Sequence, residues 1–248
     1  MESKYVFIIL ALCFFYMITA SASFGKSAYL GPLGSFTSEA AMEYFEEHFP
    51  NEELIPMKYD EMFAAYKNNE ITNLCVPMTT SVVGMVGRYI DEILKLDKVT
   101  IIGEYPKPIV YSLLSKRGAE IGRIKTVVSH PVALEEAKPW LDENMPGVLR
   151  KTALSTGAAA KQLSEGNSLE SAVLGPEVNA AIYDLEVLAA GIEEGPHNVT
   201  RFCILGRDMP NPSGNDKTTL VVRAVDSEFN DILGWFSKHR IKIIGIFE

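Results

Sequence analysis

Between residues 27 and 206, short apolar runs alternate with segments whose apolar residues recur at helical spacing. The runs "SAYLGP" at 27–32 and "ITNLCVPM" at 71–78 have the character of strands, whereas "TSEAAMEYFEEHF" at 37–49 has that of a helix. The alternation continues to a last strand, "TRFCILG", at 200–206. Strands that alternate with helices predict an α/β fold with mostly parallel sheets covered on both faces.

The segment after this region has a different pattern. A polar, turn-rich stretch at 207–217 is followed by a predicted strand at 218–225, a helix at 227–240 and a strand at 241–248. A single β-α-β unit is too small to bury its own apolar face. We therefore expect it to pack against the main domain or a partner chain, as in a homodimer, or to be a fragment of a longer domain.

The N-terminus carries an almost unbroken apolar run from Tyr5 to Thr19, preceded by Lys4 and followed by Ala20-Ser21-Ala22. The run is shorter than the roughly 20 residues of a membrane-spanning helix. It predicts a secretory signal peptide at 1–22, cleaved after Ala22, and hence a secreted or extracytoplasmic protein without a stable membrane span. An uncleaved membrane anchor is the alternative interpretation.

Composition narrows the choice of partners and chemistry. The net charge of −9 comes without a basic stripe, which argues against nucleic acid and anionic membranes as partners. The four histidines lack metal-ligand spacing, and no nucleotide-binding loop or Gly-x-Ser-x-Gly elbow is present, so we predict no metal and no cofactor. Cys75 and Cys203 lie in apolar runs and are predicted to be buried free thiols, with a disulfide between them as the alternative.

Four predicted strands end in a hydroxyl-rich step that opens a helix. Any one of them is explained by helix capping, in which a hydroxyl accepts a free N–H of the first turn. Four together at the carboxyl ends of strands predict a hydroxyl-lined site, in which helix N-termini receive the carboxylates of a small polyanion. The candidates are Ser35 and Thr37; Thr79, Thr80 and Ser81; Ser129 and His130; and Ser155 and Thr156.

Several stretches, in order along residues 27–207, resemble the prephenate dehydratase domain. They are "AYLGPLGSFTSEAA" at 28–41, "VVSHPVAL" at 127–134, "STGAAAKQLSEG" at 155–166 and the stretch at 180–207 that contains Thr200-Arg201-Phe202. Residues 217–248 resemble the first half of the ACT regulatory domain that often follows.

The resemblance implies a two-lobed fold like that of type II periplasmic binding proteins, with a cleft between the lobes. It places the domain at 26–207, with one lobe at about 26–104 and 186–207 and the other at about 105–185. A partial, ACT-like β-α-β region would follow at 217–248. Asp226-Ser227-Glu228-Phe229 stands where that region would bind phenylalanine, so feedback inhibition is not expected.

The resemblance also implies a hydro-lyase reaction, in which prephenate loses carbon dioxide and its ring hydroxyl to give phenylpyruvate without a cofactor. Arogenate, the amino-acid analogue, is the alternative substrate. Thr200 matches the family's catalytic threonine, which is thought to supply a proton to the leaving hydroxyl. Arg201 is expected to brace the cleft wall or bind a carboxylate, and Phe202 to pack. Gly84 fits the family pattern as part of the substrate site.

Three positions of the expected cleft depart from the family pattern; one is Val132, which replaces a polar residue after Ser-His-Pro. Thr79 and Thr80 stand where an acidic residue and an amide are usual, and the amide is a substrate-binding candidate. This departure, with the secreted location, supports a rival hypothesis: a small-dicarboxylate-binding module that has lost turnover. A third hypothesis, decarboxylation without aromatisation, is disfavoured because such relatives typically lack the threonine.

Asn198-Val199-Thr200 is also an N-glycosylation motif, which would place Asn198 on an exposed loop. The resemblance favours the cleft instead, because asparagine commonly precedes Thr-Arg-Phe in the family.

Overall fold

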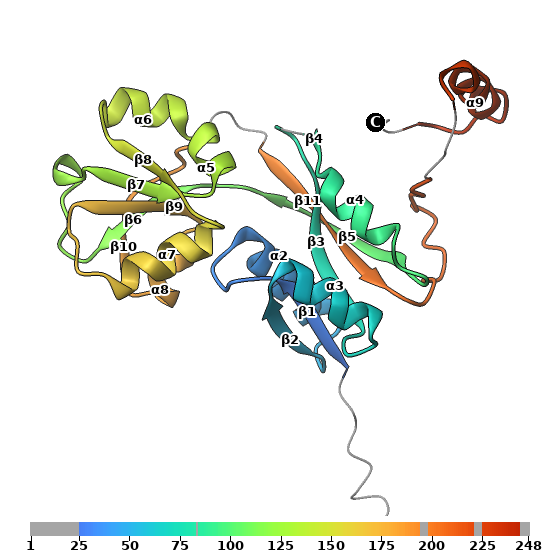
Figure 1. Ribbon diagram of the computed structural model, residues 1–248, viewed down its shortest axis with the longest axis horizontal. Helices are drawn as coiled ribbons and strands as arrows, with labels where there is room; N and C mark the ends of the chain where they lie inside the picture. The colour runs from blue at the N-terminus through green and yellow to red at the C-terminus, as the bar shows by residue number, and fades with distance from the viewer. Residues whose placement is uncertain (1–24, 83, 194–197, 221–224, 244–248) are drawn as a thin grey trace, which may run out of the picture. The chain divides into compact units, whose positions relative to one another are not determined.

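The computed structural model describes residues 25–248 except 83, 194–197, 221–224 and 244–248. The chain forms two compact units, one ending at Asp208 and the other beginning at Met209 (Figure 1). The predicted signal peptide at 1–22 lies outside the described residues. Within the described part of the chain, no helix is both long enough and apolar enough to cross a membrane.

The first unit contains two mixed β-sheets. In the first sheet the strand order is β2-β1-β3-β11-β5, with the short β4 paired to β3. β1 is parallel to β2 and β3, whereas β11 is antiparallel to both of its neighbours. The strands are β1 (Lys26–Leu30), β2 (Glu53–Met57), β3 (Asn73–Thr80), β4 (Gly84–Met85), β5 (Thr100–Pro108) and β11 (Val199–Gly206). Its helices are α2 (Phe36–His48), α3 (Tyr59–Lys67) and α4 (Gly87–Ile93).

The second sheet has the order β10-β6-β9-β7-β8. β7 is parallel to β8 and β9, and β6 is antiparallel to β9 and β10. The strands are β6 (Ser112–Lys116), β7 (Thr126–Ser129), β8 (Leu149–Thr152), β9 (Ser171–Gly175) and β10 (Leu185–Ala190). Its helices are a 3-10 turn (Ile121–Arg123), α5 (Pro131–Glu136), α6 (Lys138–Asn144), α7 (Thr156–Glu165) and α8 (Asn179–Ile182).

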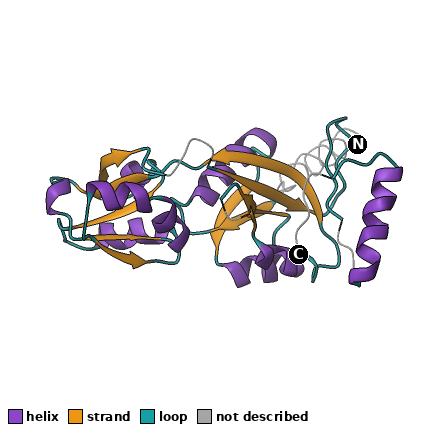
Figure 2. Ribbon diagram, turned by 90° about the horizontal axis from the view of Figure 1, so that it is seen from above, coloured by secondary structure: helices purple, strands orange, loops and turns teal. Residues whose placement is uncertain are grey.

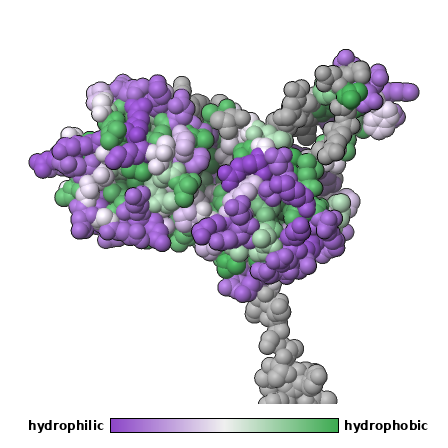
Figure 3. Space-filling model, viewed as in Figure 1, coloured by the Kyte–Doolittle hydropathy of each residue, from purple (hydrophilic) through white to green (hydrophobic). Residues whose placement is uncertain are grey.

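Helices cover both faces of each sheet, as Figure 2 shows, so the predicted α/β fold is confirmed. The expectation of mostly parallel sheets is wrong, because β4, β6, β10 and β11 pair antiparallel with their neighbours. The apolar sequence of β11 follows from its burial on both faces of the first sheet. Phe202 and Ile204 pack in the core that contains residues of α2, while Cys203 and Leu205 pack in the core that contains residues of α3. Because neighbouring strand residues point to opposite faces, a strand buried on both faces reads as a continuous apolar run. In Figure 3 the visible surface of the first unit is mainly hydrophilic.

The lobe boundaries expected from the family resemblance shift in the structure. β5 remains paired with β11 as far as Pro108, so residues 105–108 belong to the first sheet. β10 pairs antiparallel with β6, which assigns residues 186–190 to the second sheet. The first sheet therefore extends to Pro108, four residues beyond the expected boundary. The chain returns to the first sheet only after Ala190, where β10 of the second sheet ends.

A second correction concerns the helix predicted to start at Thr79–Ser81. Instead, Thr79 and Thr80 pair antiparallel with Met85 and Gly84. The chain turns back as a hairpin because Gly84 adopts a φ of 76°, in the left-handed region that favours glycine. The helix α4 begins only at Gly87.

The second unit is described mainly through α9 (Asp226–Lys238), which agrees with the predicted helix. The described parts of the two predicted flanking strands, residues 218–220 and 241–243, have no regular secondary structure. Residues 221–224 and 244–248 of those strands lie outside the described residues.

Both described cysteines are buried and neither forms a disulfide, which confirms the prediction of buried thiols. Burial, with a smaller contribution from nearby Cys203, raises the pKa of the Cys75 thiol well above its usual value. A thiol that is both enclosed and protonated is a poor nucleophile.

We expect neither thiol to react rapidly with a disulfide reagent such as DTNB at pH 8 in native protein comprising residues 23–248. Both thiols should react within seconds after unfolding in guanidinium chloride. Spectrophotometric titration measures the number of reactive thiols, and a Cys203→Ser variant assigns them. Rapid reaction of a full equivalent in the native protein would contradict the burial of these strands.

Candidate functional site

Thr200 lies in the middle of the first sheet with hydrogen-bonded strands on both sides. It is opposite Thr80 in β3 and opposite Lys107 in β5. Side chains at directly opposed positions project from the same face of a sheet. Thr80, Thr200 and Lys107 therefore form a row across three strands, and Thr200 is only 8% exposed.

Lys107 is a cation that the sequence analysis did not identify. Its side chain is 14% exposed, and its ammonium lies 2.8 Å from Glu43 Oε1 and 3.6 Å from Glu39 Oε2, both on α2. Burial raises the pKa of the Glu39 carboxyl, and the Lys107 ammonium opposes that shift. The only signal in the sequence is a lysine between two prolines in an otherwise apolar stretch.

Arg201 and Phe202 have structural contacts. The Arg201 guanidinium donates a hydrogen bond to Glu104 Oε1 at 3.2 Å, across to β5 on the exposed side. Phe202 is 1% exposed and packs in the core. These contacts fit the bracing expected of Arg201 and the packing expected of Phe202.

The helix-capping interpretation accounts for three of the hydroxyl or imidazole candidates. Ser35 Oγ accepts from Ser38 N at the start of α2, and Ser155 Oγ accepts from Ala158 N at the start of α7. His130 Nδ1 accepts from Val132 N at the start of α5. Burial, and to a smaller extent the charge of Arg88, lowers the pKa of His130, which favours the neutral ring that can accept this bond.

The remaining candidates differ in their surroundings. Ser129 is fully buried and donates to Leu174 O at 2.8 Å, so its hydroxyl ties β7 to β9 and does not line a site. Ser81 holds the start of β11, because Ser81 N donates to Val199 O and Ser81 Oγ accepts from Val199 N, both at 2.9 Å. Thr37 and Thr156 are buried in the first turns of α2 and α7.

The N-termini of α2 and α7 lie side by side, as expected for candidates at one rim. A Cβ added to Gly157 would lie 2.5 Å from Leu33 O and 3.0 Å from Ser35 N. The Tyr183 hydroxyl also donates to Leu33 O at 2.7 Å. The structure thus brings Ser35 close to the turn that contains Thr156, although α2 packs on the first sheet and α7 on the second.

Asn179 lies beside this junction and was not recognised from the sequence. It is fully buried, and a Cβ on Gly34 would lie 1.9 Å from its Oδ1. Among the described residues, neither polar atom of its side chain has a hydrogen-bond partner. A buried amide without hydrogen-bond partners destabilises the folded protein by about 1–3 kcal/mol. Asn179 is therefore an unsatisfied polar group at the junction of α2 and α7.

Asn198 of the glycosylation motif is buried, at 7% exposure. Its Nδ2 donates to Glu136 Oε2 at 2.6 Å, and its carbonyl accepts from Ile109 N at 2.8 Å. The amide nitrogen that would carry a glycan is therefore enclosed and already bonded in the folded protein. This geometry agrees with the interior position favoured for the motif over an exposed loop.

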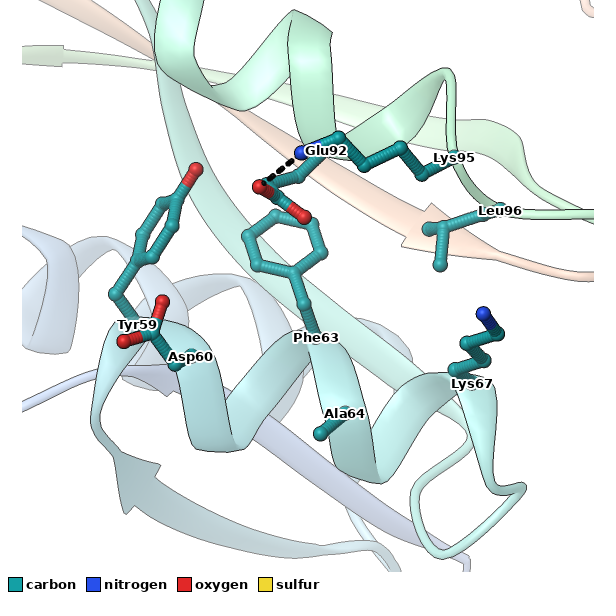
Figure 4. A pocket seen from close by; sticks show the side chains of 8 residues that line it. All are labelled: Tyr59, Asp60, Phe63, Ala64, Lys67, Glu92, Lys95 and Leu96. Carbon is teal, nitrogen blue, oxygen red and sulfur yellow. Dashed lines mark hydrogen bonds and ion pairs between the residues drawn. The ribbon is translucent and has the colours of Figure 1, made fainter.

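A surface groove of about 300 Å³ lies between α3 and α4 (Figure 4). It is lined by Tyr59, Asp60, Phe63, Ala64, Lys67, Glu92, Lys95 and Leu96, and Lys95 forms an ion pair with Glu92 at 2.8 Å. None of the candidate site residues lines this groove.

Comparison with known proteins gives one consistent family. The family model for prephenate dehydratase matches residues 27–210. The chain is 34% identical over 197 residues to the bifunctional chorismate mutase/prephenate dehydratase of Neisseria gonorrhoeae, covering 79% of this chain and 54% of the relative. It is 33% identical over 206 residues to the prephenate dehydratase of Amycolatopsis methanolica, covering 81% of this chain and 65% of the relative.

Among solved structures, prephenate dehydratase from Arthrobacter aurescens in complex with L-Phe has a TM-score of 0.74 at 27% identity. The match covers 86% of this chain and 72% of the Arthrobacter chain. The chain thus spans about half of the Neisseria relative and 65% of the Amycolatopsis relative.

We expect Gly157→Ala to destabilise the protein by about 1–3 kcal/mol, because the new methyl group would overlap backbone atoms of the turn before α2. In an exposed helix the same change usually stabilises by up to about 1 kcal/mol. Urea unfolding measures the difference. In the control, Gly122→Ala, the added carbon meets nothing within 4 Å, and a change within about 0.5 kcal/mol is expected. A Gly157→Ala protein as stable as the wild type would contradict the close approach of the two helix N-termini.

Proposed function

Because the chain belongs to the prephenate dehydratase family, we propose that it converts prephenate into phenylpyruvate, carbon dioxide and water. The observation that carries the proposal is the position of Thr200, nearly buried in β11 and in line with Thr80 and Lys107. Phenylpyruvate is the keto acid that corresponds to phenylalanine, which places the reaction in aromatic amino acid biosynthesis.

The proposed reaction needs one proton at a defined place. The carbon–carbon bond to the ring carboxylate breaks, and its electron pair enters the ring as the carbon–oxygen bond of the ring hydroxyl breaks. The departing hydroxide takes a proton from the Thr200 hydroxyl and leaves as water, and solvent returns a proton to Thr200. A threonine hydroxyl is a very weak acid, so it acts only as a donor held in position. Aromatisation of the ring supplies the driving force.

The substrate is a dicarboxylate, and the structure supports a place for it. The N-termini of α2 and α7 lie together, and each presents backbone N–H groups and the positive end of a helix dipole. The Lys107 ammonium adds a positive charge in the row that contains Thr200. Its ion pairs with Glu39 and Glu43 partly neutralise that charge. These groups favour anions without a metal ion or a cofactor.

Two alternatives are part of the proposal. Arogenate carries an amino group where prephenate has a keto oxygen and would undergo the same bond changes. A dicarboxylate-binding module without turnover is favoured by a specific observation: Thr79 and Thr80, where the family pattern has an acidic residue and an amide, are held in the β3–β4 hairpin beside Thr200.

We expect Thr200→Ala to lower kcat for phenylpyruvate formation by at least about 100-fold, because the change removes the proposed proton donor to the leaving hydroxyl. Stability should change little, since only a hydroxyl and a methyl group are removed. Thr200→Ser, which keeps the hydroxyl, should retain much of the activity. The assay uses residues 23–248 with prephenate and, separately, arogenate.

Thr152→Ala, an exposed threonine in β8, is the matched control and should leave kcat unchanged. Full activity of Thr200→Ala would rule out its assigned role. A wild-type protein that binds prephenate by calorimetry but turns over neither substrate would instead support the binding module.

We also propose that residues 1–22 direct the protein out of the cytoplasm, on the basis of the apolar run from Tyr5 to Thr19 and the small residues after it. When the full chain is expressed with a C-terminal tag in a secreting host, the tagged product should accumulate outside the cytoplasm and begin at Ser23. Mass spectrometry of the N-terminal peptide gives the answer. A product that retains Met1 would argue against cleavage.

A further inference from the structure

Glu136 is a buried acid for which the proposed reaction has no use. It is the last residue of α5 and is 7% exposed. Its Oε2 accepts the 2.6 Å hydrogen bond from Asn198 Nδ2. Within the described part of the chain, no lysine, arginine or histidine forms an ion pair with it. A buried carboxylate without a cation depends on hydrogen-bond donors for its stability.

Tyr111 belongs to the surroundings of this carboxylate. It lies between β5 and β6 and is 4% exposed. Burial, and then the charge of Glu136 and a hydrogen bond with it, raises the pKa of the Tyr111 hydroxyl well above its usual value. The hydroxyl therefore stays protonated and acts as a donor. A second carboxylate, that of Glu193, accepts a hydrogen bond from the backbone N–H of Tyr111 at 2.8 Å.

Asn198 connects this carboxylate to Thr200, two residues further along. The backbone of residues 198 and 199 is held by Ile109 N on one side and by Ser81 on the other. The side chain of Asn198 adds a third anchor, from α5 of the second sheet. Three separate segments of the chain thus fix the point where it enters β11.

We propose that Glu136 and Asn198 are a pair of positioning residues, in which the buried carboxylate fixes the Asn198 amide and so sets the entry of β11 and the direction of the Thr200 hydroxyl. The proposal rests on the proposed function of Thr200. It also assigns the asparagine of the glycosylation motif a role inside the folded protein. A short bond to a charged acceptor suits this role, because such bonds are strong and directional.

The chemistry of the pair allows a test by exchange of donor and acceptor. Asn198→Asp places two carboxylates where one hydrogen bond stood. In the double variant Asn198→Asp/Glu136→Gln, the new amide nitrogen at position 136 donates to the new carboxylate at position 198. The amide oxygen at position 136 still accepts from Tyr111. In Glu136→Gln alone, the Asn198 amide can rotate to accept from the new amide, so the bond survives in reversed form.

We expect Asn198→Asp to lower kcat by about 100-fold with KM changed by less than about 3-fold, the pattern of a misplaced reacting group. The double variant and Glu136→Gln should both lie within about 5-fold of the wild type in kcat. Asn144→Asp makes the same chemical change at an exposed position of α6 and should leave kcat and KM unchanged. All proteins are made in bacterial cytoplasm, so glycosylation does not enter the comparison.

A second measurement does not depend on turnover. Amide hydrogen exchange at residues 199 and 200 should be about 10-fold faster in Asn198→Asp, because the entry of β11 is loosened, and should return toward the wild-type rate in the double variant. If the wild type turns over neither prephenate nor arogenate, the proposed function fails while this exchange pattern still supports the pair. Wild-type kcat and exchange in folded Asn198→Asp, or a double variant no better than Asn198→Asp, would overturn the proposal.

Discussion

The position of β11 between β3 and β5 is the constraint on which the rest of the first unit depends. Hydrogen bonds on both edges fix its register, and its alternate side chains enter the cores on opposite faces of the sheet. If the register of β11 shifted by one residue, its side chains would exchange faces of the sheet. Phe202 would then point toward α3, and Thr200 would leave the face that carries Lys107. The location of Thr200 therefore follows from the packing of its apolar neighbours.

The candidate site lies where elements of the two sheets meet, and polar contacts join them there beside the ring contact of Phe36 with Tyr111. Tyr183 bonds to the backbone before α2, and Glu136 bonds to the residue that leads into β11. Polar contacts specify a geometry more narrowly than apolar packing does, since a misplaced partner leaves a buried group unsatisfied. This arrangement suits a site that must orient a weak proton donor.

The parts of the fold that depend on local pattern could be predicted from the sequence. The alternation of apolar runs with segments of helical spacing predicted the α/β class. The capping roles of Ser35, Ser155 and His130 could also be predicted, because each side chain bonds to a backbone N–H only two or three residues away. The step at Thr79–Ser81 was predicted wrongly as a helix start, because its hydroxyls and the apolar residues after it suit a helix. Pairing of β3 with β4 outweighed that local preference. Glu136 and Lys107 were missed because their significance lies in partners distant in the chain; the Glu136–Asn198 bond spans 62 residues. Asn179 was missed because its burial against Gly34 also depends on a segment far away in the sequence.

The topology of the first sheet also affects how the protein is made. β11 is the last strand of the first unit to be synthesised, yet its place is inside the sheet, between strands that end at residues 80 and 108. While the ribosome makes residues 109–198, β3 and β5 have no strand between them, and the sheet cannot close. Long-range pairing of this kind makes folding slow and late. The first sheet therefore closes only after Gly206 has been made, whereas the strands of the second sheet lie between residues 112 and 190 and can pair before β11 exists.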